Sequence, residues 1–238
     1  MVVQGGPQGV SASREQMLSV IRTALGREEL AAATAAALER RLRQPRANVV
    51  PARGRVPAER RVELFIAEAE RVNATAVRLA RLDEVPTAVV SYLRAANMPA
   101  VVRAGTDTLL RSVPWAREPV LQVKTGAAVD EDAVSVTSAF AGIAETGTLM
   151  LYSTPESPTT LNFLPEAHIA VLPTDRIVGT YEDAWQRLRG LLGAGKMPRV
   201  VNWITGPSRT ADIEQTLLLG AHGPKRLHIV LVDGDSRR

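Results

Sequence analysis

The sequence contains no cysteine in its 238 residues. The chain therefore forms no disulfide, carries no thiolate nucleophile, and supplies no sulfur ligand to zinc or to an iron–sulfur cluster. It has three histidines, His168, His222 and His228, and no two of them have the spacing of metal ligands on one helix. We therefore expect no metal site in this chain.

Long apolar segments and cofactor motifs are also missing. Charged residues or proline interrupt each apolar run well short of the roughly 20 residues that cross a bilayer. Residues 1–13 lack the apolar core of a signal peptide, so we expect a soluble, cytoplasmic protein without a membrane span. Neither Gly-x-Gly-x-x-Gly nor Gly-x-x-x-x-Gly-Lys occurs, so we expect this chain to hold no nicotinamide, flavin, ATP or other cofactor.

Lysine is scarce, because only three of the 29 basic residues are lysines and the others are arginines. The formal net charge of +4 and the isoelectric point of about 9.9 are compatible with nucleic-acid binding. However, no aromatic residue lies among the clustered arginines to stack on bases. We expect the cluster to be a solvated face or a docking surface for an acidic partner, and no nucleic acid to bind. The clustered arginines are Arg40, Arg41, Arg43, Arg46, Arg53, Arg55, Arg60 and Arg61.

Hydrophobic periodicity divides the chain into a helical N-terminal part and an α/β remainder. Residues 1–55 are predicted to be a helical arm with an Arg-rich linker, since the segment 45–57 has no core periodicity. Residues 56–238 are predicted to form one α/β domain, because helical and β-branched segments alternate. The predicted helices are Arg14–Leu25, Leu30–Leu42, Ala58–Leu82, Val85–Ala96 and Thr180–Leu192. The predicted strands are Pro99–Arg103, Leu121–Val123, Ala133–Thr137, Leu149–Tyr152, Ile169–Leu172, Val200–Ile204 and Leu227–Val232.

The densest group of special residues lies in the segment 203–225. We expect a strand there, a turn at Gly206-Pro207, a helix ending near Gly220, and a second strand. Such a unit directs unpaired N–H groups and hydroxyls beyond the end of the first strand. The residues predicted to form one wall of a site are Gly206, Ser208, Thr210, Asp212, Glu214, His222 and Gly223.

Most of these residues also have a structural interpretation. Ser208 and Thr210 are good helix N-caps, and Asp212 and Glu214 in a first turn would complement the helix dipole. A hydrolytic triad is not indicated, because the Gly-x-Ser-x-Gly elbow is absent. His222 precedes Gly223-Pro224 and is a candidate acid, base or anion donor near neutral pH. The other two histidines are expected to be structural.

A second candidate group, Glu145 to Thr148, precedes the strand Leu149–Tyr152. Gly147 permits a positive φ or a close approach of the backbone to a ligand, and Thr146 and Thr148 are candidate ligand-binding residues. Glu145 is a candidate catalytic base or nucleophile, and the alternative is a turn glutamate bonded to backbone amides. Because ligands of α/β sheets bind where strands meet loops, we expect this group and the C-terminal group to share one cleft. The polar segment 152–160 is predicted to be a loop that can close over a ligand.

Three ordered blocks resemble the LUD-domain family, and within it the lactate utilization protein C (LutC) branch. The blocks are Ile143-Ala-Glu-Thr-Gly-Thr-Leu149, Leu164-Pro-Glu-Ala-His-Ile169, and Gly206-Pro-Ser-x-Thr-x-Asp-Ile-Glu214 with His222-Gly-Pro224. The resemblance covers residues 120–233 well and the N-terminal half loosely. It implies a three-layer α/β/α fold with a mixed sheet, similar to that of the ribose-phosphate isomerases, glucosamine-phosphate deaminases and CoA transferases.

The resemblance also implies a role. It suggests a subunit that acts with LutA-like and LutB-like iron–sulfur proteins in oxidising L-lactate to pyruvate, and that binds a small anionic ligand, its partners, or both. The clusters are then expected in the partners, because this chain has no cysteine. Two alternatives stay open. One is a stand-alone enzyme of the sugar-phosphate isomerase, CoA-transferase or formyltetrahydrofolate cyclo-ligase type that uses Glu145 and His222, and the other is a non-catalytic assembly factor.

Overall fold

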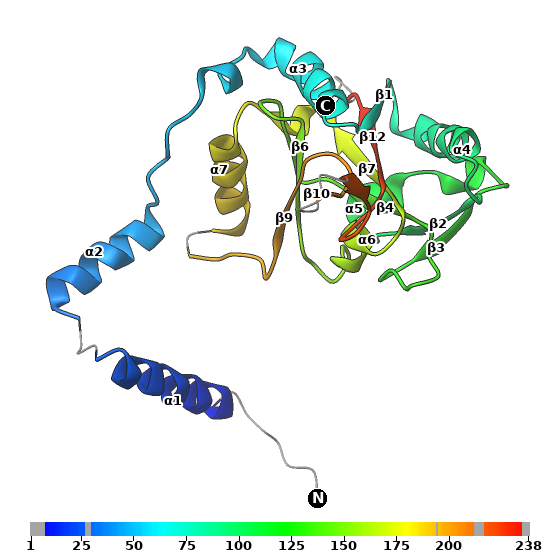
Figure 1. The fold of residues 1–238 in the computed structure, drawn as a ribbon. Helices are drawn as coiled ribbons and strands as arrows, with labels where there is room; N and C mark the ends of the chain where they lie inside the picture. The colour runs from blue at the N-terminus through cyan, green and yellow to red at the C-terminus, as the bar shows by residue number, and fades with distance from the viewer. Residues whose placement is uncertain (1–7, 27–29, 194, 212–216, 235–238) are drawn as a thin grey trace, which may run out of the picture. The chain divides into compact units, whose positions relative to one another are not determined.

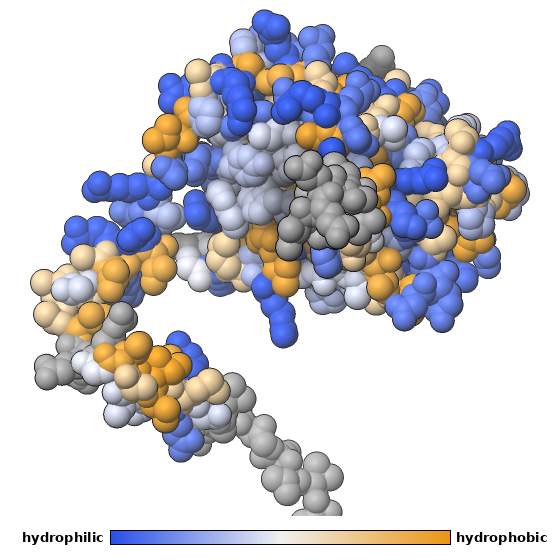
Figure 2. Space-filling view, in the orientation of Figure 1, coloured by the Kyte–Doolittle hydropathy of each residue, from blue (hydrophilic) through white to orange (hydrophobic). Residues whose placement is uncertain are grey.

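The computed structural model describes residues 8–26, 30–193, 195–211 and 217–234. The chain divides into two compact units, Met1–Arg46 and Ala47–Arg238. The first contains the helices α1 (Gln8–Ala24) and α2 (Ala32–Arg43) (Figure 1), and apolar side chains appear on the surface of both (Figure 2). Neither helix therefore buries a full apolar face within its own unit. No helix in the described parts of the chain has both the length and the apolar character that a bilayer requires.

The second unit is built on a six-stranded sheet in which every neighbouring pair is parallel (Figure 1). Two adjacent interior strands, β7 and β12, are buried along almost their whole length. This burial explains why both appear in the sequence as nearly continuous apolar runs. The strand order is β1 (Thr75–Leu79), β12 (Arg226–Val232), β7 (Ala167–Pro173), β4 (Val134–Ser138), β2 (Val101–Ala104) and β3 (Gln122–Thr125).

Helices cover both faces of this sheet. On one face, α4 (Val85–Ala95) and the short α5 (Thr108–Ser112) contribute to a core that includes Val230. On the other face, α3 (Ala58–Arg71) contributes to a second core that includes Leu231. Successive residues of one strand thus enter opposite cores, as strand geometry requires. The predicted α/β class with helices on both faces is confirmed.

A smaller mixed sheet packs beside α3. Its order is β8 (Ile177–Val178), β5 (Ala141–Ile143), β6 (Thr148–Tyr152) and β9 (Val201–Ile204). β5 and β8 are parallel, whereas β6 is antiparallel to both of its neighbours. The expected mixed pairing therefore lies in this sheet, and the six-stranded sheet is wholly parallel. The helix α7 (Tyr181–Leu192) covers the smaller sheet and begins at a capping box on Thr180. The predicted helix Thr180–Leu192 is thus confirmed.

The predicted helix Ala58–Leu82 is wrong in its second half. The helix α3 ends at Arg71, and Asn73 has a left-handed φ of 67°. The Ala74 N–H donates to the Ala69 carbonyl at 3.0 Å, a Schellman bond that terminates the helix. The chain then continues as the edge strand β1, because its backbone groups pair with β12.

The helix predicted after Gly206-Pro207 is also wrong. The strands β10 (Arg209–Ala211) and β11 (Leu217–Leu219) form an antiparallel hairpin instead. Three consecutive leucines suit a strand as well as a helix, and pairing across the hairpin decides between the two. The predicted site residues Asp212 and Glu214 lie outside the described residues.

Candidate functional site

The C-terminal segment encloses a cavity of about 350 Å³, which we call the hairpin pocket. Its walls come from the end of β9, the base of the β10–β11 hairpin, and α6 (Thr160–Phe163). His168 and Leu227, near the starts of β7 and β12, complete it, so it lies at the amino ends of these parallel strands. The lining residues are Asn162, Phe163, His168, Trp203, Ile204, Thr205, Gly206, Pro207, Ser208, Arg209, His222, Gly223, Pro224 and Leu227.

Backbone contacts hold the hairpin side of this pocket. Gly206 has a φ of 72° and lies against the Val72 carbonyl, where a Cβ atom has no room. The Ser208 N–H donates to the Pro224 carbonyl at 2.8 Å, and the Ser208 carbonyl accepts from the Gly220 N–H at 2.9 Å. Ser208 is thus fixed at the base of the hairpin, and its predicted role as a helix N-cap is wrong.

Two buried side chains that line the hairpin pocket have atoms without a hydrogen-bond partner among the described residues. They are Asn162 Oδ1 and His168 Nδ1, on residues that are 2% and 0% exposed. The other ring nitrogen of His168, Nε2, lies 2.6 Å from Thr137 Oγ1. Burial lowers the pKa of His168 to about 4, so its ring is neutral at pH 7. Buried polar atoms without partners are rare and costly, so this pair marks a place where a ligand group can bind.

Sequence reasoning missed both of these residues as site components. Asn162 has no distinguishing local pattern, and it reaches the pocket only because α6 packs on β4 and β7. For His168, the Leu-Pro-x-x-His block that carries the family resemblance could have indicated a site residue. The sequence alone predicted a structural histidine there. The hairpin pocket therefore combines two buried, uncharged polar side chains with apolar walls such as Trp203. Two exposed basic side chains, Arg209 and His222, also line it.

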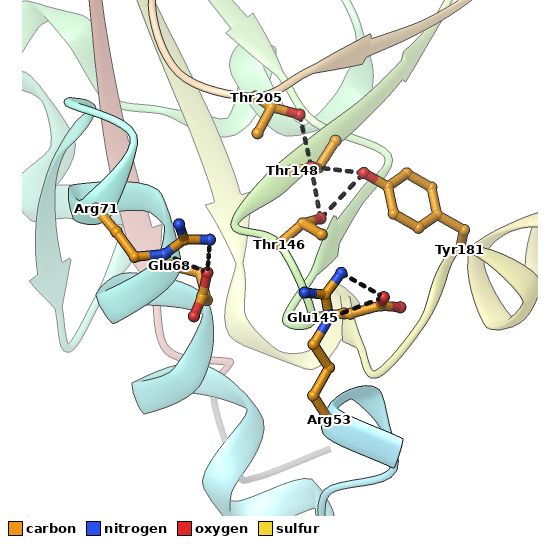
Figure 3. A network of polar contacts seen from close by, with 8 residues as sticks. All are labelled: Arg53, Glu68, Arg71, Glu145, Thr146, Thr148, Tyr181 and Thr205. Carbon is orange, nitrogen blue, oxygen red and sulfur yellow. Dashed lines mark hydrogen bonds and ion pairs between the residues drawn. The ribbon is translucent and has the colours of Figure 1, made fainter. Parts of the chain in front are cut away.

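The threonines of the second candidate group form a hydroxyl cluster with Tyr181 of α7 and with Thr205, which follows β9 (Figure 3). Thr148 Oγ1 lies 2.7 Å from Thr146 Oγ1, 2.9 Å from the Tyr181 hydroxyl and 2.7 Å from Thr205 Oγ1. Thr205 also lines the hairpin pocket, so the cluster connects to that pocket through it. Gly147 has a φ of 63° and lies against the backbone of Ala69 in α3, which gives it a packing role.

Glu145 lies apart from the hairpin pocket. It is 5% exposed, and its Oε1 accepts hydrogen bonds from Arg53 Nε at 3.2 Å and Nη2 at 3.1 Å (Figure 3). Arg53 belongs to the short 3₁₀ helix Ala52–Gly54, within the segment predicted to be a linker. Part of that segment therefore packs on the α/β unit. The contacts between residues place the start of this unit at Ala47. A catalytic role for Glu145 stays a prediction.

The expected convergence on one cleft is therefore found for part of the predicted set. The predicted residues that line the hairpin pocket are Gly206, Ser208, His222 and Gly223. Thr146 and Thr148 connect to it through Thr205, whereas Thr210 lies in β10 and is not among the lining residues. The functional roles of all these residues stay predictions.

We expect Asn162→Leu to leave the free energy of unfolding unchanged or to raise it by up to about 1 kcal/mol, because an unpaired buried oxygen is replaced by apolar atoms. As a contrast, Thr137→Val removes the partner of His168 and should cost about 1–3 kcal/mol. Urea denaturation of the unmodified protein and of the two variants measures both changes in the free energy of unfolding. A loss above about 2 kcal/mol for Asn162→Leu would assign the amide a structural role.

A parallel sheet covered by helices on both faces, with a cavity beside its amino edge, defines a three-layer α/β protein. The chain belongs to the LUD-domain family. The model of the LUD domain matches residues 131–232. A lactate utilization protein C from Exiguobacterium sp. is 31% identical over 181 residues, which are 73% of this chain and 78% of that protein.

Other relatives match over a shorter region. The lactate utilization protein C of Shouchella clausii is 36% identical over 42% of this chain and 44% of its own length. An uncharacterized protein of Neisseria meningitidis is 44% identical over 38% of each chain. The matched region is thus less than half of each of these two relatives. A crystal structure of a DUF162 family protein from Deinococcus radiodurans has a TM-score of 0.56 and covers 74% of this chain and 99% of that one, and at 21% identity it supports the fold alone.

Proposed function

We propose that this chain is a LutC-like subunit of a cytoplasmic iron–sulfur system that oxidises L-lactate to pyruvate. The observation that carries the proposal is the 31% identity with a lactate utilization protein C over 78% of that protein's length. The proposed partners are LutA-like and LutB-like iron–sulfur proteins. The exposed apolar side chains of α1, such as Met17 and Val20, support a role in docking to such partners.

In this proposal the electrons of lactate pass through the partners. Removing two electrons from a 2-hydroxy acid requires an acceptor, which in proteins is usually a nicotinamide, a flavin, a haem or a metal cluster. The sequence has no cysteine for a cluster and no dinucleotide motif. These features support a binding or organising role for this chain rather than electron transfer by the chain itself.

The hairpin pocket is the proposed ligand-binding site of the subunit. Its buried Asn162 and His168 offer hydrogen bonds to the uncharged part of a small molecule. Arg209 and His222, both exposed, offer positive charge or donors to an anionic group. A small anionic ligand fits both features, and a terminal carboxylate of a partner chain has the same chemistry.

The proposal predicts that the isolated chain does not oxidise lactate. The chain, purified without chromophores, is assayed for lactate-dependent dye reduction alone and together with the LutA-like and LutB-like proteins. We expect no turnover by the chain alone, and a complete system whose rate falls when the chain is left out. Robust turnover by the isolated chain would contradict both the subunit role and the passage of electrons through the partners, and an unchanged rate without the chain would also contradict a subunit role.

The pocket is tested in the complete system with Gly223→Leu. A side chain at this position extends toward Ser208 and Phe163 without a backbone clash, so it fills the hairpin pocket. The matched control is Gly190→Leu, at an exposed position on α7 with no neighbour within 4 Å. We expect the first variant to lose most of the chain-dependent rate and the control to retain it. Full activity of Gly223→Leu would leave the chain as an assembly factor that does not use its pocket.

A further inference from the structure

A second cavity lies at the opposite, carboxyl edge of the six-stranded sheet. Its volume is about 200 Å³, and its lining shares no residue with the hairpin pocket. Asp107 and Thr108 follow β2, Ser138 ends β4, and Arg176 follows β7. We call this cavity the switch-point pocket.

The chain path explains why a cavity forms there. The adjacent parallel strands β2 and β4 continue in opposite directions across the sheet, since β2 leads to β3 on one side and β4 leads on to β7 on the other. The connections that leave their carboxyl ends therefore diverge and leave a crevice between them. In open α/β sheets, this topological switch point is where ligands bind.

Asp107 lines this crevice, and one of its two carboxylate oxygens is buried. Its Oδ1 accepts from the backbone N–H groups of Leu109 at 3.1 Å and Leu110 at 3.4 Å. Its Oδ2 is buried and has no hydrogen-bond partner among the described residues. A charged oxygen without a partner is costly, and the first oxygen already caps α5, so the second is available to a donor on a ligand.

Arg176 supplies the opposite charge. Its Nη1 donates to the Ala139 carbonyl at 3.2 Å, which fixes the guanidinium beside the end of β4. An arginine has five N–H donors in a planar fork, so most of them remain available to a carboxylate or phosphate group. One full positive charge thus lies in the same small cavity as one buried carboxylate oxygen.

The polar loop 152–160 covers this cavity. The Thr106 N–H, just beyond β2, donates to the Glu156 carbonyl at 2.8 Å, and Thr154 and Ser157 are among the residues that line the pocket. Sequence reasoning predicted a loop here that closes over a ligand, and the hairpin pocket does not use it.

We propose that the switch-point pocket binds a small hydroxylated anion. The anionic group, a carboxylate or a phosphate, pairs with Arg176, and a hydroxyl on a nearby carbon of the same molecule donates to Asp107 Oδ2. The volume of about 200 Å³ restricts the ligand to a few carbon atoms.

Calorimetric titration of the full chain tests this proposal with two matched pairs of probes. L-lactate is compared with propionate, which lacks only the hydroxyl, and glycerol 3-phosphate is compared with propyl phosphate, which lacks only the two hydroxyls. We expect the hydroxylated member of at least one pair to bind about tenfold tighter than its partner, because the other leaves Asp107 Oδ2 unpaired. The pair that shows this preference identifies the anionic group as carboxylate or phosphate. Equal affinities within both pairs, or no binding of any probe, would overturn the proposal.

Variants assign the binding to this pocket. Asp107→Asn keeps an oxygen to cap α5 but replaces the second oxygen by a donor, so the preference for the hydroxylated probe should disappear. Arg176→Met should abolish binding, and Arg176→Lys should weaken it by about tenfold because the fork is lost. The controls are Arg111→Met, an exposed arginine of α5, and Gly223→Leu in the hairpin pocket, and both should bind normally. Unchanged binding by the Asp107 and Arg176 variants would overturn the assignment, whatever the outcome for the hairpin pocket.

Discussion

Acidification from about pH 7 to about pH 4.5 is expected to reduce the free energy of unfolding by roughly 5 kcal/mol, through two buried histidines. Burial lowers the pKa values of His168 and His228 from 6.5 to about 4. His168 contacts Thr137, whereas His228 stacks on Tyr92 at 4.1 Å between ring centroids. Both rings are therefore held in the neutral form.

The sign follows from proton binding in the two states. Between about pH 6.5 and pH 4 the unfolded chain binds protons at these histidines and the folded chain does not, so acid favours unfolding. The stabilisation that the two neutral histidines contribute is fully present above the histidine pKa of the unfolded chain. It is lost as the pH falls from about 6.5 to about 4. Urea denaturation at several pH values measures the slope.

Single replacements separate the two contributions. His168→Gln should remove about half of the pH dependence, and His222→Gln, at an exposed position, is the matched histidine control that should retain it. A free energy of unfolding that stays constant between about pH 7 and pH 5 would contradict the buried, neutral state of both rings.

Gly147→Ala is expected to cost about 3 kcal/mol or more. The residue has a φ of 63°, and an added Cβ would overlap the backbone of Ala69 in α3. The left-handed conformation alone costs a non-glycine residue about 1–2 kcal/mol, and overpacking against a rigid backbone adds about 1–3 kcal/mol. The loss also loosens the contact between α3 and the strand that carries Thr148.

Gly195→Ala is the matched control for this substitution. Gly195 has a φ of 73°, but no atom lies within 4 Å of its added Cβ, so only the conformational cost of about 1–3 kcal/mol applies. Urea or thermal denaturation of the two variants isolates the steric part. Equal losses for both would show that Gly147 is required for its backbone conformation and not for the close approach of α3.

The sequence by itself determined the elements whose causes are local. The helix predicted over Thr180–Leu192 matches α7 nearly to its bounds, and the capping box that begins this helix joins residues only three positions apart. The apolar runs predicted β7 and β12, because strands buried on both faces need apolar side chains at nearly every position. The absence of cysteine likewise excluded thiolate chemistry without any reference to the fold.

Only the tertiary structure decided the features that depend on distant pairing. The segment Thr75–Leu79 has a helical pattern but forms β1, because β12, about 150 residues later, satisfies its backbone. The three leucines Leu217–Leu219 pair with β10 for the same reason. The candidate site was predictable at Gly206 and His222, where glycine and proline mark turns, but not at Asn162, which reaches the pocket through packing alone. A local pattern records a residue's own conformational preference, whereas its partners are chosen by the free energy of the whole folded chain.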